Sequence, residues 1–214
     1  MRCGKIVCVG QNYREHIREM RSEEPAEPVL FLKPPTSLVG PRAAIRIPEG
    51  IGAVHHEVEL ALVIGRGGRN IAPGRALRHV SSVAVFNDVT ARDLQTAARR
   101  AGLPWALAKG MDTFAPMSRP APLEEVGDLG VLELELRVNG ELRQKGSTSQ
   151  MIFPPAVLIS YISRFMTLEE GDIIATGTPS GVGPIVPGDV VEAVIPGVGK
   201  LRNPVQSQKR LVRA

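Results

Sequence analysis

Two glutamates stand two positions apart inside an apolar stretch, HEVELALVI at residues 56–64. The aliphatic and β-branched residues around them predict a buried strand. Because side chains alternate faces along a strand, Glu57 and Glu59 would project from one face, with Cα atoms roughly 6–7 Å apart. Two like charges on a half-buried face repel each other and are costly to desolvate. Either this face is solvated, or a cation bound by both carboxylates offsets that cost.

A third carboxylate follows the next predicted strand, at residues 81–87. Thr90 and Asp93 resemble a capping box that opens a helix at residues 91–100. Asp93 is then explained as a cap, whereas Asp88, at the strand end, remains free to bind a ligand. The two glutamates and this aspartate form an oxygen-only set, which suits Mg²⁺, Mn²⁺ or Ca²⁺ and disfavours zinc or copper.

Strand signals dominate the rest of the chain, which has 214 residues and a hydrophobic content of 43%. This length fits one domain with a sizeable core. The 18 prolines and 22 glycines are spread through the chain and argue against long helices. The pattern therefore predicts a β-rich α+β domain. The other predicted strands are residues 29–33, 132–138, 141–145, 172–176 and 189–195, with a hairpin at 139–140 and further helices at 12–20 and 155–166.

The formal net charge of +4 and pI of about 9.4 make a nucleic-acid-binding β-barrel an alternative. The basic residues are scattered and aromatic residues make up only 4%, so we expect no nucleic-acid partner. No apolar run approaches a membrane span, and the N-terminal stretch is too short and polar for a signal peptide. We expect no membrane partner and a cytoplasmic location. Cys3 and Cys8 lack zinc or disulfide spacing and are expected to be free thiols.

His16 and Glu19 are three residues apart in a polar stretch predicted as a helix, so their side chains would be neighbours. A carboxylate beside an imidazole fixes its tautomer and raises its basicity, which suits a general base. An ordinary surface helix with paired charges explains the same pattern, and the residues alone favour that explanation. Residues 21–28 are charged and contain two prolines, and we predict that residues 11–27 form a mobile lid.

Two further features leave alternatives open. Lys109 lies in an apolar region, where an ammonium group is costly unless it meets a negative partner. The glycine-rich loop at residues 176–184 could form an anion-binding nest from its backbone N–H groups, or be a simple turn. It lacks the spacing of a P-loop or of a dinucleotide-binding fingerprint.

A series of short motifs runs through nearly the whole chain: VGQNYREH at 9–16, FLKP at 31–34, HHEVEL at 55–60, NDVTARDLQ at 87–95, GLPW at 102–105, AK at 108–109 and TGTPSGVG at 176–183. In order and spacing this series resembles the fumarylacetoacetate hydrolase family. GELRQ at 140–144 and SQMIF at 149–153 are similar to its short acylpyruvase and oxaloacetate decarboxylase branch. The resemblance implies a mixed β-sandwich roll of the type found in the C-terminal domain of that family, and a homodimer.

The resemblance also implies roles for individual residues. It makes Glu57, Glu59 and Asp88 the ligands of Mg²⁺, with Mn²⁺ or Ca²⁺ as alternatives. It makes His16 and Glu19 a catalytic dyad, in place of an ordinary surface helix.

In the family pattern, Lys109, Gln95 and Thr178 would contact a small 2-oxo acid substrate, and Lys109 would also act in catalysis. The implied reaction is metal-dependent hydrolysis of the C–C bond of acylpyruvate-type 2,4-dioxo acids, with oxaloacetate decarboxylation as a second activity. The alternative within the family is a 2-hydroxyhepta-2,4-diene-1,7-dioate isomerase or decarboxylase of aromatic catabolism. We expect residues 1–214 to form a single catalytic domain with a polar tail at 206–214.

Overall fold

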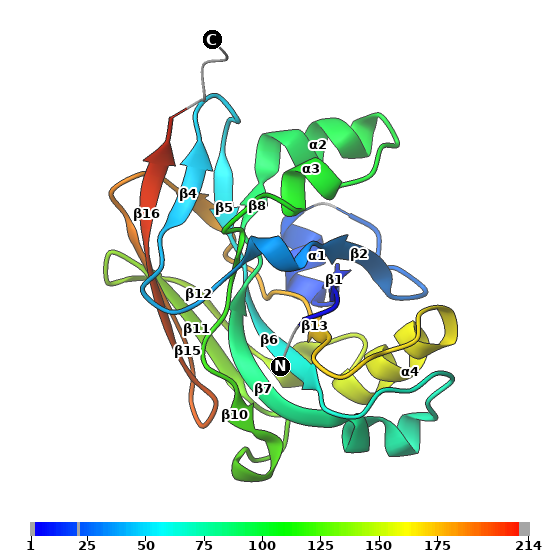
Figure 1. Cartoon of the computed structure of the whole chain (residues 1–214). Coiled ribbons are helices and arrows are strands. Elements are labelled where there is room, and N and C mark those ends of the chain that lie inside the picture. Colours follow the sequence, from blue (N-terminus) through cyan, green and yellow to red (C-terminus); the bar gives the residue numbers. More distant parts are fainter. Residues whose placement is uncertain (1–2, 21, 210–214) are drawn as a thin grey trace.

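The computed structural model describes residues 3–20 and 22–209, and it contains a six-stranded mixed sheet (Figure 1). In spatial order the strands are β10 (Ala121–Pro122), β7 (Val80–Asn87), β6 (Val58–Ile64), β13 (Ile173–Ala175), β1 (Ile6–Gly10) and β2 (Val29–Lys33). β1 and β13 run parallel, and the other neighbouring strands are antiparallel. β6 is buried along its whole length, which explains its nearly continuous apolar sequence.

A five-stranded sheet packs against β6 and β7, and apolar side chains of both sheets form one hydrophobic core. Leu60 and Val85 of the first sheet and Leu134 and Leu136 of the second are fully buried there. In spatial order the second sheet contains β12 (Glu141–Ser147), β11 (Glu133–Val138), β15 (Val190–Ile195), β16 (Gly199–Gln208) and β4 (Ile45–Pro48). The smaller sheets are β14 (Gly183–Ile185), β5 (Val54–His56) and β8 (Thr90–Ala91), and β3 (Leu38–Val39) with β9 (Ala115–Pro116).

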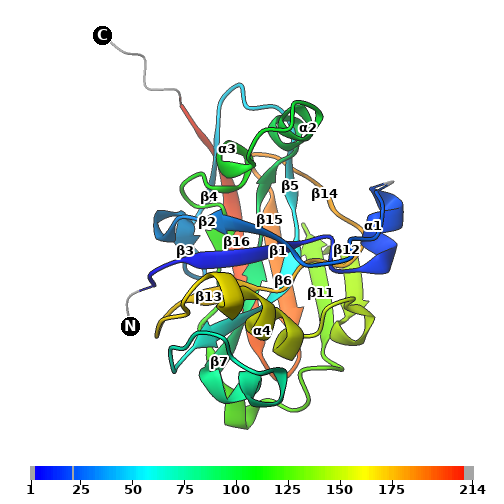
Figure 2. The same ribbon diagram turned by 90° about the vertical axis from the view of Figure 1, so that its right-hand side faces the viewer.

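Short helices connect the strands, and Figures 1 and 2 both place α2 and α3 at one end of the molecule and α4 toward the other. The α-helices are α1 (Arg14–Glu19), α2 (Arg92–Arg100), α3 (Ala106–Lys109) and α4 (Pro155–Phe165). The 3-10 helices are η1 (Pro35–Ser37), η2 (Pro73–His79), η3 (Leu123–Glu125) and η4 (Thr148–Gln150). In the part of the chain described here, no helix is long and apolar enough to cross a membrane.

The predicted fold class and free cysteines are confirmed, but the predicted polar tail begins too early. Residues 206–208 are the end of β16, where Gln206 and Ser207 pair in parallel with Arg46 and Ile47 of β4. The partner strand lies far away in the sequence, so local polarity alone suggested a tail. Residues 210–214 of that predicted tail lie outside the described residues.

The predicted capping box at the start of α2 is wrong. Thr90 belongs to β8, and its hydroxyl donates to the carbonyl of Asp88 at 2.8 Å. Ala91 is the N-cap residue and makes no side-chain capping bond, whereas Asp93 accepts the N–H of Ala53 at 2.9 Å. Pairing of β8 with β5 holds Thr90 in extended backbone, so its side chain does not reach the first turn of the helix.

Candidate active site

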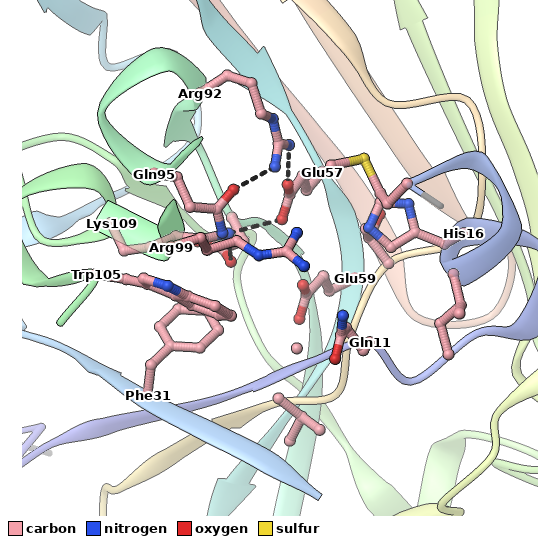
Figure 3. A pocket seen from close by; sticks show the side chains of 16 residues that line it. Gln11, His16, Phe31, Glu57, Glu59, Arg92, Gln95, Arg99, Trp105 and Lys109 are labelled. Carbon is pink, nitrogen blue, oxygen red and sulfur yellow. Dashed lines mark hydrogen bonds and ion pairs between the residues drawn. The ribbon is translucent and has the colours of Figure 1, made fainter. Parts of the chain in front are cut away.

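Three carboxylates meet where β6 and β7 lie side by side (Figure 3). Glu57 directly precedes β6, Glu59 lies on it, and Asp88 directly follows β7. The Asp88 N–H donates to the Glu57 carbonyl at 2.8 Å, which fixes the two segments against each other. One oxygen from each carboxylate lies within 4.8 Å of the others, and all three residues are buried. The predicted ligands therefore converge as an oxygen-only site for a hard divalent cation requires.

Three buried cations neutralise two of these carboxylates. Lys109 Nζ donates to Glu57 Oε2 at 2.8 Å and to Asp88 Oδ2 at 2.5 Å. Lys33 Nζ donates to Asp88 Oδ1 at 2.5 Å, and the Arg92 guanidinium pairs with Glu57. Burial disfavours the charged form of Glu57, but Lys109 and Arg92 outweigh it and lower the pKa of this carboxyl below its ordinary value. Glu57 is therefore ionised and held in place.

Glu59 is equally buried, but among the described residues it accepts one hydrogen bond, from the Gly177 N–H at 2.7 Å. Gly177 has a φ of +97°, and a Cβ there would meet the Cβ of Asn12 at 2.8 Å, so only glycine permits this approach. Burial, together with Asp88 and Glu57, raises the pKa of Glu59 well above its ordinary value. A cation shared by the three carboxylates would remove that penalty, so the donor set fits a divalent metal.

The predicted pairing of His16 with Glu19 is present on α1. The imidazole is 8% exposed, and its Nδ1 is 3.1 Å from Glu19 Oε2. Burial would raise the pKa of Glu19, but hydrogen bonds from His16 and the Gly181 N–H outweigh it and lower that pKa. In the neutral tautomer that donates Nδ1–H to this carboxylate, Nε2 is the acceptor nitrogen. The ring lines the pocket that holds the three carboxylates, as a general base would (Figure 3).

The segment predicted as a lid lies against the body of the protein. Tyr13 and Ile17 are buried, and the Asn12 carbonyl accepts the Ile152 N–H at 2.8 Å. Ile17 and Met20 both line the pocket. Residues 11–20 therefore contribute one side of the site, residue 21 lies outside the described residues, and the mobility of residues 11–27 stays a prediction.

The hydrogen bonds of Gln144 determine which way the Thr178 hydroxyl donates. Gln144 Oε1 accepts from the Val58 N–H at 3.1 Å and lies 2.8 Å from His56 Nδ1. Gln144 Nε2 donates to the Pro179 carbonyl at 3.0 Å and to Thr178 Oγ1 at 2.8 Å. Because the amide nitrogen only donates, Thr178 Oγ1 must accept here, and its own proton is free for a group in the pocket.

Aromatic and polar side chains complete the wall of the pocket. The rings of Phe31 and Trp105 lie 5.5 Å apart, and Lys109 Nζ is 4.9 Å from the centroid of Phe31. Gln95 Oε1 accepts a hydrogen bond from Arg92 at 2.5 Å, so its amide N–H groups remain available as donors. The residues that the sequence assigned to the site all line this pocket, except Glu19, which lies behind His16.

Sequence analysis missed two buried polar residues that support the site. Lys33 ends the apolar strand β2 and is 1% exposed, and Gln144 on β12 is also 1% exposed. A lysine at the end of an apolar strand was a usable signal for a buried partner charge. Gln144 gave no such signal, because polar residues are common on a strand with one solvated face.

Comparisons with known proteins connect this geometry to a family. The sequence profile described as fumarylacetoacetate (FAA) hydrolase C-terminal matches residues 5–206. Oxaloacetate tautomerase FAHD1 of Arabidopsis thaliana, a mitochondrial protein, is 50% identical over 202 residues, which covers 94% of this chain and 91% of that protein.

Two solved structures share both the fold and substantial sequence identity. Fumarylpyruvate hydrolase from Pseudomonas aeruginosa, in complex with Mn²⁺ and pyruvate, is 37% identical with a TM-score of 0.93, covering 96% of this chain and 91% of that one. The 2-hydroxyhepta-2,4-diene-1,7-dioate isomerase from Mycobacterium marinum is 42% identical with a TM-score of 0.87, and the match covers 97% of this chain and 76% of that one. The similar proteins thus carry three different activities on one fold.

Proposed function

This chain belongs to the fumarylacetoacetate hydrolase family, and we propose that it is a divalent-metal-dependent enzyme that moves protons on small 2-oxo acids. The substrate that we favour is oxaloacetate, interconverted between its keto and enol forms. The observation that carries the proposal is one pocket that combines a carboxylate triad with a histidine whose Nδ1 is paired with Glu19. The Arabidopsis thaliana tautomerase supports this choice of substrate.

The carboxylates of Glu57, Glu59 and Asp88 would hold the metal. Their oxygen-only set suits Mg²⁺, with Mn²⁺ or Ca²⁺ as alternatives, and the Pseudomonas aeruginosa hydrolase contains Mn²⁺ together with pyruvate. When bound, a divalent cation supplies Lewis-acid polarisation of the 2-oxo group and compensates the charge of an enolate.

Three side chains offer hydrogen-bond donors to the substrate. Lys109 donates two of its three N–H groups to carboxylates, and the third is available to the substrate. The Gln95 oxygen accepts from Arg92, so its amide N–H groups are available to the substrate. The Thr178 oxygen accepts from Gln144, so its hydroxyl proton is available as well. These three donors favour anionic oxygens, such as those of a 2-oxo carboxylate.

His16 would carry the proton. Its Nε2 takes a proton from C3 of the keto form, and the imidazolium that results is stabilised by Glu19. The enolate oxygen then takes a proton from water, and the imidazolium gives its proton to water, so that the enol and the neutral base result. In the reverse direction the enol oxygen loses its proton to water, and the imidazolium, protonated by water, delivers its proton to C3. One base therefore serves both directions of the tautomerisation.

A second candidate is the hydrolysis of acylpyruvates, and the His16–Glu19 pair is the observation that favours it. The same Nε2 would remove a proton from a water that attacks the distal carbonyl, and C–C cleavage would then leave an enolate of pyruvate. The fumarylpyruvate hydrolase from Pseudomonas aeruginosa supports this activity as well. A homodimer and a cytoplasmic location stay predictions of the sequence.

The proposal is tested by assaying keto–enol exchange of oxaloacetate, release of pyruvate, and loss of acylpyruvates with Mg²⁺ or Mn²⁺. We expect catalysis of oxaloacetate exchange that saturating EDTA abolishes. The variant Glu59→Gln should be inactive, while Glu124→Gln, which alters an exposed acid outside the pocket, should match the parent. Turnover that survives EDTA, or the absence of turnover on every one of these substrates, would contradict the proposal.

A further inference from the structure

One cation of the pocket differs from the others in having no carboxylate partner among the described residues. Lys33, Lys109 and Arg92 each pair with a carboxylate of the metal triad. Arg99 also lines the pocket, but its recorded side-chain hydrogen bond is to the neutral hydroxyl of Ser22. Within residues 3–20 and 22–209, no carboxylate therefore pairs with its positive charge.

The position of Arg99 follows from the geometry of α2. Arg92, Gln95 and Arg99 are spaced by three and four residues, so they share one face of the helix, and all three line the pocket. Figure 3 shows the Arg99 guanidinium reaching over the pocket between Gln95 and Glu59. Its Nη2 donates to Ser22 Oγ at 3.1 Å, which holds the group at the pocket mouth.

A guanidinium has five N–H donors, and the bond to Ser22 uses one of them. The remaining planar edge matches the two oxygens of a carboxylate, a pairing that combines charge with a fixed geometry. Because Arg99 is exposed, its charge is solvated when no ligand is bound, and no buried charge is left unpaired.

The charge balance of the pocket favours a ligand with a second carboxylate. Lys33, Lys109 and Arg92 pair with Glu57 and Asp88, and the formal charges of these three cations and of the three triad carboxylates cancel, so Arg99 adds one positive charge. A divalent metal would raise the surplus to three. The enolate of a 2-oxo dicarboxylate carries three negative charges, whereas the enolate of a 2-oxo monocarboxylate carries two.

We propose that Arg99 is a specificity-determining residue that binds the distal carboxylate of a 2-oxo dicarboxylic acid such as oxaloacetate. This inference rests on the proposed function and names the substrate class of the same site. The competing explanation is an ordinary arginine in the last turn of a helix, where a positive charge favours the helix dipole. Arg100 occupies the same turn but does not line the pocket, so it provides a matched control.

Two unreactive ligands that differ in the distal carboxylate measure its contribution to binding. Malate has the carbon skeleton of oxaloacetate with a hydroxyl at C2, and 2-hydroxybutyrate replaces its distal carboxylate with a methyl group. Their dissociation constants are measured by calorimetry in saturating Mg²⁺ for the parent, Arg99→Gln, Arg99→Lys and Arg100→Gln. Thermal unfolding of each variant verifies that the chain is folded.

In the parent we expect malate to bind more tightly than 2-hydroxybutyrate. Arg99→Gln should raise the dissociation constant of malate about ten- to hundredfold, the usual effect of losing hydrogen bonds to a charged group. The dissociation constant of 2-hydroxybutyrate should stay unchanged. The malate affinity of Arg99→Lys should fall between those of the parent and Arg99→Gln, because lysine keeps the charge but not the planar arrangement of donors. Arg100→Gln should bind both ligands as the parent does. Equal affinity of the parent for both ligands, or equal weakening of both by Arg99→Gln, overturns the subsite.

Turnover of oxaloacetate by the parent, measured in parallel, separates this inference from the proposed function. Normal turnover with no effect of Arg99→Gln on the ligand pair would overturn the subsite alone. Absent turnover would contradict the proposed function, while the two ligands would still report whether Arg99 recognises a distal carboxylate.

Discussion

Asp172, directly before β13, and Glu59, on β6 of the same sheet, are both buried carboxylates, yet their surroundings differ. Asp172 accepts the Lys5 N–H at 3.1 Å and the Glu169 N–H at 2.7 Å, and it also pairs with the Lys5 ammonium. Glu59 accepts one N–H, from Gly177 at 2.7 Å, and faces two other carboxylates across a pocket. The difference shows that unused acceptor capacity toward a cavity, rather than burial, distinguishes a ligand site from a structural ion pair.

The largest expected effect comes from neutralising each of these two carboxylates. Glu59→Gln should abolish activity and leave stability without metal unchanged or higher, because it removes repulsion and can still accept the Gly177 N–H. Asp172→Asn should reduce the free energy of unfolding by about 1–3 kcal/mol, because its amide group would face donors. The folded fraction of that variant should remain active. Urea unfolding and kcat/KM are measured for both variants. The distinction between a ligand carboxylate and a structural one fails if both variants lose activity, or if both lose stability, to the same extent.

The next largest effect is expected from His16, the proposed general base, which lines the pocket with Glu59. His16→Ala should lower kcat/KM about 10²–10⁴-fold for tautomerisation and for acylpyruvate hydrolysis, the usual contribution of a positioned base. Oxaloacetate decarboxylation should fall much less, because it needs no proton abstraction or attacking water. Arg18→Ala, on the exposed side of α1, is the control. Equal losses in all three reactions would mean that His16 only positions the substrate or the covering segment.

A smaller effect is expected from the hydrogen-bond chain that orients Thr178. Gln144→Glu replaces a donor with an acceptor, so the Thr178 proton would turn away from the pocket. We expect KM to rise about tenfold with a smaller change in kcat, whereas Thr178→Ser should remain close to the parent. In a Thr178→Val background the Gln144 substitution should add little, and an additive effect in that double-mutant cycle would show that Gln144 acts only through folding.

The smallest effect is a pH dependence at Glu19. Its pKa is lowered in the folded protein, so it contributes stability that is present above its ordinary value of about 4.5 and is lost as the pH falls through the folded value. Because the side chain is one-third exposed, solvent screening limits the contribution to a few tenths of a kcal/mol. The stability difference between the parent and Glu19→Gln should therefore shrink between pH 6 and pH 3. A difference that grows toward low pH would reverse the assigned sign.

The sequence predicted the parts of the site that depend on local order. Glu57, Glu59 and Asp88 were recognisable because they interrupt or end two apolar strands, and these strands pair as neighbours in the sheet. Lys33 was missed because its contact with Asp88 joins segments 55 positions apart. Gln144 was missed because polar residues are common on a strand with one solvated face, and its partner His56 lies 88 positions away.

The same limit explains the errors in the fold. Pairing of β16 with β4, which turns part of the predicted tail into a strand, joins residues about 160 positions apart in the numbering. The capping box failed because β8 pairs with β5 and takes Thr90 into a strand. Local propensity was overridden in both cases by a partner that the nearby residues do not reveal.

Thermal unfolding in increasing Mg²⁺ tests most directly whether the triad is a metal site. A ligand present at a hundred times its dissociation constant stabilises the folded state by about 2.7 kcal/mol, which raises Tm by about 5–10 °C for a chain of this size. We predict such a rise for the parent and for Asp172→Asn, and none for Glu59→Gln. A parent Tm that does not respond to Mg²⁺ or Mn²⁺, or an equal rise for Glu59→Gln, would contradict the assignment of the triad as the metal site.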